Sequence, residues 1–171
     1  MKGCLATEPV RELETLARLY VESRRQRQRS EPATGRTLIL EEMRDAFEKA
    51  GVWKLMMQNT SVARYTKPGD PMKFDFAYRV GDSLKIFHAV SLRASIDQAV
   101  VLASRYPAIA DGINRKDHTT PVLTAIIDDD LDRLNEQTLF ALAMMEDATI
   151  TVKAAEDMPA IAETARRDLR A

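Results

Sequence analysis

The sequence predicts an α/β fold with a mixed central sheet, a three-stranded antiparallel meander and flanking helices. Apolar residues recur at every second position through residues 72–92, and at every third or fourth position in the segments on either side. Both faces of the alternating segments are largely apolar, which is typical of a sheet covered by helices on both sides. A chain of 171 residues is long enough to form one domain with its own core.

Residues 1–36 are expected to form an N-terminal helix and a linker, followed by a single α/β domain over residues 37–171. The first helix would begin at Thr7 and end in a stretch with four arginines. These are Arg24, Arg25, Arg27 and Arg29. Pro32 and Gly35 break any helix after this stretch, so residues 30–35 are expected to be a linker or a mobile loop.

The middle of the chain predicts one helix and then three strands. Leu40, Met43 and Phe47 share a helical face over residues 38–50, and Gly51 suits a left-handed C-cap. The period then changes to two. Strands are expected over residues 61–66, 72–80 and 83–92, with the turn 67–71 between the first two.

The remaining segments alternate between helix and strand. Ser95 and Gln98 form a capping-box pattern for a helix that Pro107 is expected to interrupt. The apolar, β-branched run over residues 120–127 predicts a buried central strand. Three further elements are expected: a helix from Asp130 or a neighbour to about Met145, a strand over 148–152, and a final helix opened by Asp157 and Pro159.

The hairpin turn at Gly81 and Asp82 sets the register of its two strands. A two-residue turn pairs Val80 with Ser83, and the same register places Asp75 directly across from His88. An acid that faces an imidazole is a candidate catalytic pair. The alternative is a structural ion pair or a hydrogen-bonded core histidine, and this structural interpretation is favoured.

The predicted element order resembles the αβββαβ core of the restriction-endonuclease-like fold. In that fold an acid on the second strand and an acid-x-lysine on the third bind a divalent metal, which activates water. Asp75 occupies the first position, but His88-Ala-Val90 stands where the second acid and the lysine belong. The resemblance therefore implies a non-catalytic or degenerate nuclease-like module that binds a protein or nucleic-acid partner and needs no cofactor.

The alternative hypothesis is a Mg²⁺-dependent nuclease. It would use Asp75 together with Asp128, Asp129 and Asp130, which directly follow the predicted central strand. Capping of the next helix explains the same three acids more simply, because negative charge is favourable at a helix N-terminus. Capping is the favoured interpretation.

The formal net charge of −1 provides no overall field that would attract nucleic acid. The four arginines within residues 24–29 are nevertheless a candidate partner-binding surface, with a solvated helix end as the alternative. Cys4 is the only cysteine, which excludes an internal disulfide and a cysteine-based zinc site. With no signal peptide and no membrane span expected, the sequence predicts a cytoplasmic protein that does not enter a membrane.

The stretch Phe74-Asp-Phe-Ala-Tyr-Arg-Val-Gly81, followed by His88-Ala-Val-Ser-Leu92, resembles the C-terminal half of an uncharacterised bacterial family, a domain of unknown function. The resemblance covers residues 37–152. This chain departs from the family pattern at Val80, where Asn is usual. The resemblance implies a bacterial origin, in keeping with a mobile element, and carries no reaction type with it.

Overall fold

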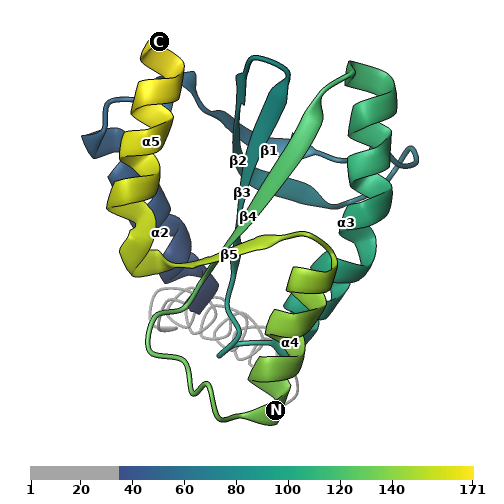
Figure 1. Cartoon of the computed structure of the whole chain (residues 1–171), viewed down its shortest axis with the longest axis vertical. Helices are drawn as coiled ribbons and strands as arrows, with labels where there is room; N and C mark the ends of the chain where they lie inside the picture. The colour runs from purple at the N-terminus through teal and green to yellow at the C-terminus, as the bar shows by residue number, and fades with distance from the viewer. Residues whose placement is uncertain (1–34) are drawn as a thin grey trace, which may run out of the picture. The chain divides into compact units, whose positions relative to one another are not determined.

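The computed structural model describes residues 35–171, which form a five-stranded mixed sheet between two layers of helices (Figure 1). The strands are β1 (Met57–Ser61), β2 (Lys73–Val80), β3 (Ser83–Val90), β4 (Thr120–Ile127) and β5 (Thr151–Ala154). They lie in chain order across the sheet. The pairs β1–β2 and β2–β3 are antiparallel, whereas β3–β4 and β4–β5 are parallel.

Four helices cover the sheet. They are α2 (Gly35–Lys49), α3 (Ile96–Asp117), α4 (Glu136–Asp147) and α5 (Met158–Arg170), with short 3₁₀ turns at Trp53–Leu55 and Ala155–Asp157. Helices α2 and α5 lie on one face and α3 and α4 on the other (Figure 1). The predicted α/β class and antiparallel meander are confirmed. The expected N-terminal helix lies outside the described residues.

Each face of the sheet has its own apolar core. On the α2–α5 side, Phe47 packs edge-on against Phe76 and Phe87. On the α3–α4 side, Leu102 and Ile109 of α3 are buried in the same cluster as Leu123 of β4. The prediction of a sheet covered on both faces is therefore confirmed.

The β2–β3 hairpin has the predicted register. Val80 pairs with Ser83 and Phe76 with Phe87 across the turn, where Gly81 has a φ of +53°. The regular backbone pairing ends at Phe76 and Phe87, and the same register extended by one residue puts Asp75 opposite His88. A shift of one residue would have placed them on opposite faces of the sheet.

Phe74 departs from the expected alternation, because it belongs to the α3–α4 core rather than to the core that holds Phe76. The residue between them provides the reason. The carboxylate of Asp75 accepts the backbone N–H of Ala89. A hydrogen bond from a side chain therefore takes the place of a backbone hydrogen bond between β2 and β3, at the point where their regular pairing ends.

The prediction of a first strand over residues 61–66 was wrong. Strand β1 lies at Met57–Ser61, and residues 62–66 form a turn in which the N–H groups of Tyr65 and Thr66 both donate to the carbonyl of Val62. The error has a physical cause. An edge strand with exposed polar side chains shows no apolar alternation, whereas the apolar residues Val62 and Tyr65 pack into the core from the turn.

The expected break at Pro107 is also absent, since α3 runs through it as one helix of 22 residues. Tyr106, Ile109 and Ile113 are all buried against the sheet on the two sides of the proline, and this packing outweighs the loss of one backbone hydrogen bond. Ser95 does occupy the N-cap of α3. Its side chain makes none of the capping bonds to the described backbone that the capping-box pattern predicts.

Two boundaries near the C-terminus differ from the predictions. Helix α4 is capped by Asn135, whose side chain accepts the N–H groups of Gln137 and Thr138, and Asp130 lies in the preceding loop. Strand β5 begins at Thr151 rather than near Ala148, because the intervening residues close the end of α4. The final helix begins at Met158 with a proline in its first turn, as predicted.

Within residues 35–171, every helix is too short or too polar to span a lipid bilayer.

Candidate functional site

The candidate site is centred on the carboxylate of Asp75 in β2. Its Oδ2 lies 3.0 Å from Nδ1 of His88 on the neighbouring strand and accepts the N–H of Ala89 at 2.8 Å. The predicted cross-strand pair is thus in contact. Within residues 35–171, Nδ1 of His88 nevertheless forms no hydrogen bond.

Arg36, in the first turn of α2, completes this cluster. Its Nη2 donates to Oδ1 of Asp75 at 2.6 Å and to Oδ2 at 2.8 Å. The Asp75 side chain is only 10% exposed, and that of Arg36 is 32% exposed. A charge-assisted contact in such a partly desolvated place is stronger than a surface ion pair.

The surroundings of Asp75 act on its pKa in opposite directions. Burial alone raises the pKa of this carboxyl group, because it penalises the charged form. The imidazole of His88, the N–H of Ala89 and the guanidinium of Arg36 together outweigh burial and hold the pKa below its usual value. Asp75 is therefore an anion at neutral pH whose two oxygens are both engaged.

A cavity of about 440 Å³ opens beside this cluster. Its wall includes Arg36, His88 and Arg105, together with apolar side chains of Met72 and Leu102. Nδ1 of His88 is buried, whereas the side chain as a whole is 15% exposed and lines this cavity.

A second cluster joins the carboxyl ends of β3 and β4, where Val90 pairs with Ile127. Oδ1 of Asp128 accepts the hydroxyl of Ser91 at 2.9 Å, and its Oδ2 accepts the N–H of Arg93 at 3.3 Å. The N-terminus of α2 abuts this pair. A Cβ atom at Gly35 would lie 2.4 Å from Oγ of Ser91, so only glycine fits there without a shift.

The three consecutive acids that follow β4 do not act together. Asp128 binds Ser91, whereas Oδ1 of Asp129 accepts the N–H of Glu156 at 2.8 Å. Asp130 has a φ of +49°, and its carbonyl accepts a bond from Arg93. The prediction that these acids cap the next helix was wrong, because their loop folds back on the sheet and Asn135 performs that role.

The described residues do not bring a metal-binding set of side chains together. No group of three or more His, Cys, Asp or Glu side chains within residues 35–171 is placed to hold a metal ion. Asp75 is engaged by Arg36, and Asp128 and Asp129 by other partners. A Mg²⁺ ion prefers several free oxygen ligands around one point, so this donor set does not suit it.

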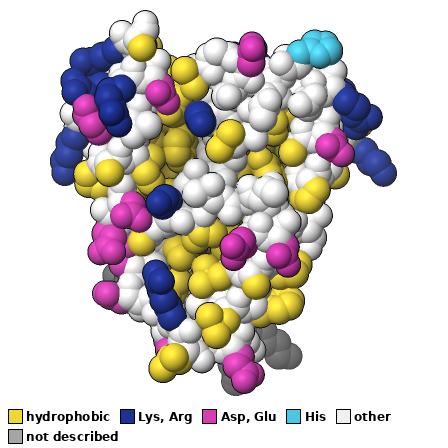
Figure 2. All heavy atoms as spheres, in the orientation of Figure 1, with side chains coloured by type: hydrophobic (Ala, Val, Ile, Leu, Met, Phe, Trp, Pro, Cys, Tyr) yellow, Lys and Arg dark blue, Asp and Glu magenta, His cyan; other side chains and the backbone are white. Residues whose placement is uncertain are grey.

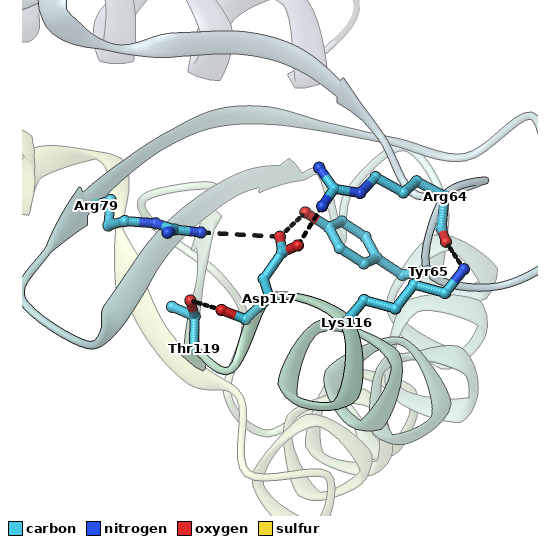
Figure 3. Close-up of polar contacts among 6 residues, drawn as sticks. All are labelled: Arg64, Tyr65, Arg79, Lys116, Asp117 and Thr119. Carbon is cyan, nitrogen blue, oxygen red and sulfur yellow. Dashed lines mark hydrogen bonds and ion pairs between the residues drawn. The ribbon is translucent and has the colours of Figure 1, made fainter.

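A third polar cluster lies at the other end of α3 (Figure 3). Asp117 binds Arg64, accepts the hydroxyl of Tyr65 at 2.6 Å and lies 3.8 Å from Nη2 of Arg79. It thereby ties the turn after β1 to β2 and to the end of α3. Asp117 is the last residue of α3, and its side chain is 8% exposed.

Sequence reasoning did not identify Arg36 or Asp117 as members of these clusters. Arg36 lies 39 positions from Asp75 and was assigned to the linker, and no local spacing connects the two. Asp117 stands in a charged stretch that is typical of solvated loops. The predicted partner-binding residues Arg24, Arg25, Arg27 and Arg29 lie outside the described residues and stay a prediction.

Comparison with known proteins returned no matching family model, no matching curated protein and no matching solved structure. The resemblances to an uncharacterised bacterial family and to the restriction-endonuclease-like core therefore stay predictions.

Proposed function

We propose that residues 35–171 are a non-catalytic, nuclease-like binding module that acts through a protein partner. The contact between Arg36 and Asp75 is the observation that supports this most directly. In the fold that the element order resembles, a carboxylate on the second strand holds a catalytic metal ion. Here a guanidinium group contacts both oxygens of that carboxylate and supplies the positive charge.

The third strand adds to this argument. His88 stands at the position where a second acid would be expected, and it contacts the same oxygen of Asp75 that Arg36 and Ala89 contact. A hard cation would have to displace Arg36 and would then find one carboxylate and one imidazole. Such a pair of ligands holds Mg²⁺ poorly.

A protein partner is favoured over nucleic acid because several arginines of the described surface already have carboxylate partners. Arg36 pairs with Asp75, Arg64 with Asp117 and Arg105 with Asp70. A phosphate would have to compete with these carboxylates, and the formal net charge of the whole chain is −1. The arginine stretch over residues 24–29 remains a predicted contact surface for the partner.

The described surface also carries large apolar side chains, which suit contact with protein better than contact with phosphates. Leu134, Leu139 and Phe140, in α4 and the residue before its cap, are each about half exposed or more. Figure 2 shows apolar side chains over the lower part of the molecule, where Figure 1 places α4. Exposed aromatic and aliphatic groups are enriched at protein–protein interfaces.

The alternative, a Mg²⁺-dependent nuclease, requires Asp75 and the acids after β4 to share one ion. Thermal unfolding with Mg²⁺ or Mn²⁺ separates the two hypotheses, because a ligand specific to the folded state raises the melting temperature. We expect the melting temperature in either metal to equal that in EDTA, and duplex and single-stranded DNA and RNA to stay intact. A metal-dependent rise that Asp75→Asn abolishes, together with cleavage, would establish the nuclease instead.

The choice of a protein partner has its own test. Fluorescence anisotropy with labelled duplex and single-stranded oligonucleotides should show only weak binding, of the order of 10⁻⁴ M or weaker at physiological salt. Submicromolar binding with a steep salt dependence would contradict the choice of a protein partner. It would leave the non-catalytic assignment in place.

A further inference from the structure

A groove of about 540 Å³ lies between α2 and α5, away from the Asp75 cluster. Helix α2 contributes positions 42, 45, 46 and 49, which share one helical face, and Ala50 follows directly after the helix. Helix α5 contributes positions 158, 159, 162 and 163. The segments that follow β4 and β5 close the groove with Asp129, Ala155 and Glu156.

The floor of the groove is apolar and consists of four alanines and Met158. Ala155, Met158 and Ala162 are buried, and Ala46 of α2 and Ala50 just after it are half-buried. Small side chains on two facing helices leave room for another side chain to approach the helix backbones. This floor therefore suits an apolar group of a ligand.

The rim of the groove is acidic. Five carboxylates and one ammonium group line it, a formal charge of −4 against −1 for the whole chain. The five acids are Glu42, Asp45, Asp129, Glu156 and Glu163. Figure 2 shows acidic side chains along the left edge of the molecule, beside the start of α5.

Nearby cations offset only part of this charge: Lys49 lies in the lining, and Asp45 interacts electrostatically with Arg44. Among the described residues, the side chains of Glu42, Asp45 and Glu156 form no hydrogen bond or ion pair, whereas Glu163 binds Arg166. Burial, and then the negative charge of Asp129, raise the pKa of Glu42. Within residues 35–171 the rim thus carries more negative than positive charge.

This combination of floor and rim narrows the chemistry of the ligand. Nucleic acid and anionic membrane surfaces would be repelled by the rim. Within residues 35–171 the acids form no cluster suited to a metal ion, so a single compact cation does not match them. A ligand that carries several cationic groups along an apolar chain does match them.

We propose that this groove binds a basic amphipathic segment of a partner protein, with apolar side chains on the alanine floor and Lys or Arg side chains at the acidic rim. The inference rests on the proposed function, because it specifies the chemistry of the protein partner. Charge complementarity would act mainly on the association rate, and the floor on the lifetime of the complex.

The probe is a fluorescently labelled peptide of about 14 residues with Lys on one helical side and Leu on the other. Its matched control has Ser in place of every Leu and the same charge. Anisotropy with the full-length chain should show saturable binding of the Leu peptide, which weakens as salt is raised. The Ser peptide should bind at least about tenfold more weakly, because it cannot use the apolar floor.

Three variants locate the binding. Glu42→Gln/Asp45→Asn should weaken the Leu peptide about tenfold and flatten its salt dependence, since two rim charges are lost. Glu136→Gln/Asp147→Asn removes the same charge from α4 and should leave affinity within about twofold. Ala46→Leu fills the floor without changing charge and should weaken the Leu peptide while thermal unfolding confirms that the chain is folded.

Equal affinity of the peptide for wild-type protein and both groove variants would overturn the groove assignment, as would equal affinity for the Leu and Ser peptides or no binding at all. Melting temperatures with Mg²⁺ are recorded on the same proteins. If the peptide does not bind and Mg²⁺ does not change the melting temperature, the groove assignment is overturned and the proposed function stands. A metal response with cleavage overturns the proposed function, whatever the peptide does.

Discussion

Nη2 of Arg36 lies 2.6 Å from Oδ1 and 2.8 Å from Oδ2 of Asp75, which joins the first turn of α2 to the second strand of the sheet. The contact has two consequences. It neutralises a carboxylate that is nearly buried, and it anchors the start of α2 next to the ends of β3 and β4, where Gly35 meets Ser91.

Removal of Arg36 should destabilise the protein. We expect Arg36→Ala to lower the free energy of unfolding by about 1–3 kcal/mol, because the carboxylate of Asp75 keeps its burial and loses a charged partner. Arg44→Ala is the matched control, because Arg44 forms an exposed pair with Glu48 and its removal should lower stability less than the removal of Arg36. Urea unfolding measures both. Equal costs would show that the Arg36 contact is no stronger than a surface pair.

Gly112→Ala should destabilise the protein, although alanine is the better helix former. Gly112 lies within α3, and a Cβ atom there would be 2.2 Å from the carbonyl oxygen of Tyr65. Relief of this overlap requires a backbone shift that we expect to cost about 1–3 kcal/mol, more than the helix propensity gained. Urea unfolding shows directly whether the substitution lowers or raises the free energy of unfolding. An increase in stability would mean that the turn around Tyr65 moves at little cost.

Thr149→Gly should stabilise the protein. Thr149 has a φ of +61° at the end of α4, where its N–H donates to the carbonyl of Glu146 and the N–H of Ile150 donates to that of Met145. A β-branched residue is strained in this left-handed conformation, and glycine is not, so we expect a gain of about 1 kcal/mol. Thr149→Ala keeps a Cβ atom and should gain less. Thermal unfolding compares the three proteins.

Asp70 should contribute stability that is lost in acid. The hydroxyl of Thr66, the N–H of Met72 and the guanidinium of Arg105 lower its pKa from 3.8 to about 2. The folded state therefore releases this proton more readily than the unfolded chain, and the stabilisation is present above about pH 4 and disappears as the pH falls towards 2.

Urea unfolding of wild-type protein and Asp70→Asn from pH 6 downward tests this. The difference in stability between them should be constant near neutral pH and should shrink below about pH 4. A difference that is independent of pH down to pH 3 would show that the Asp70 carboxylate is not held in its charged form by the fold.

Much of the sheet could be predicted from local pattern. The Gly81-Asp82 turn and the alternating strands beside it placed Asp75 across from His88, because a tight turn and a period of two determine register without help from the rest of the chain. The apolar run at residues 120–127 predicted the buried strand β4 for a similar reason. Strand β1 escaped prediction because an exposed edge strand needs no apolar side chains.

The sequence by itself thus determined the α/β class, the hairpin register and the Asp75–His88 pair. Only the tertiary structure decided what surrounds that pair, since Arg36 reaches Asp75 through the packing of α2 and not through any local spacing. The contacts of the acids after β4 could not be predicted from the sequence either. Their separate partners, Ser91 and Glu156, are brought to them by neighbouring strands and a following turn, and such long-range contacts depend on the assembled fold as a whole.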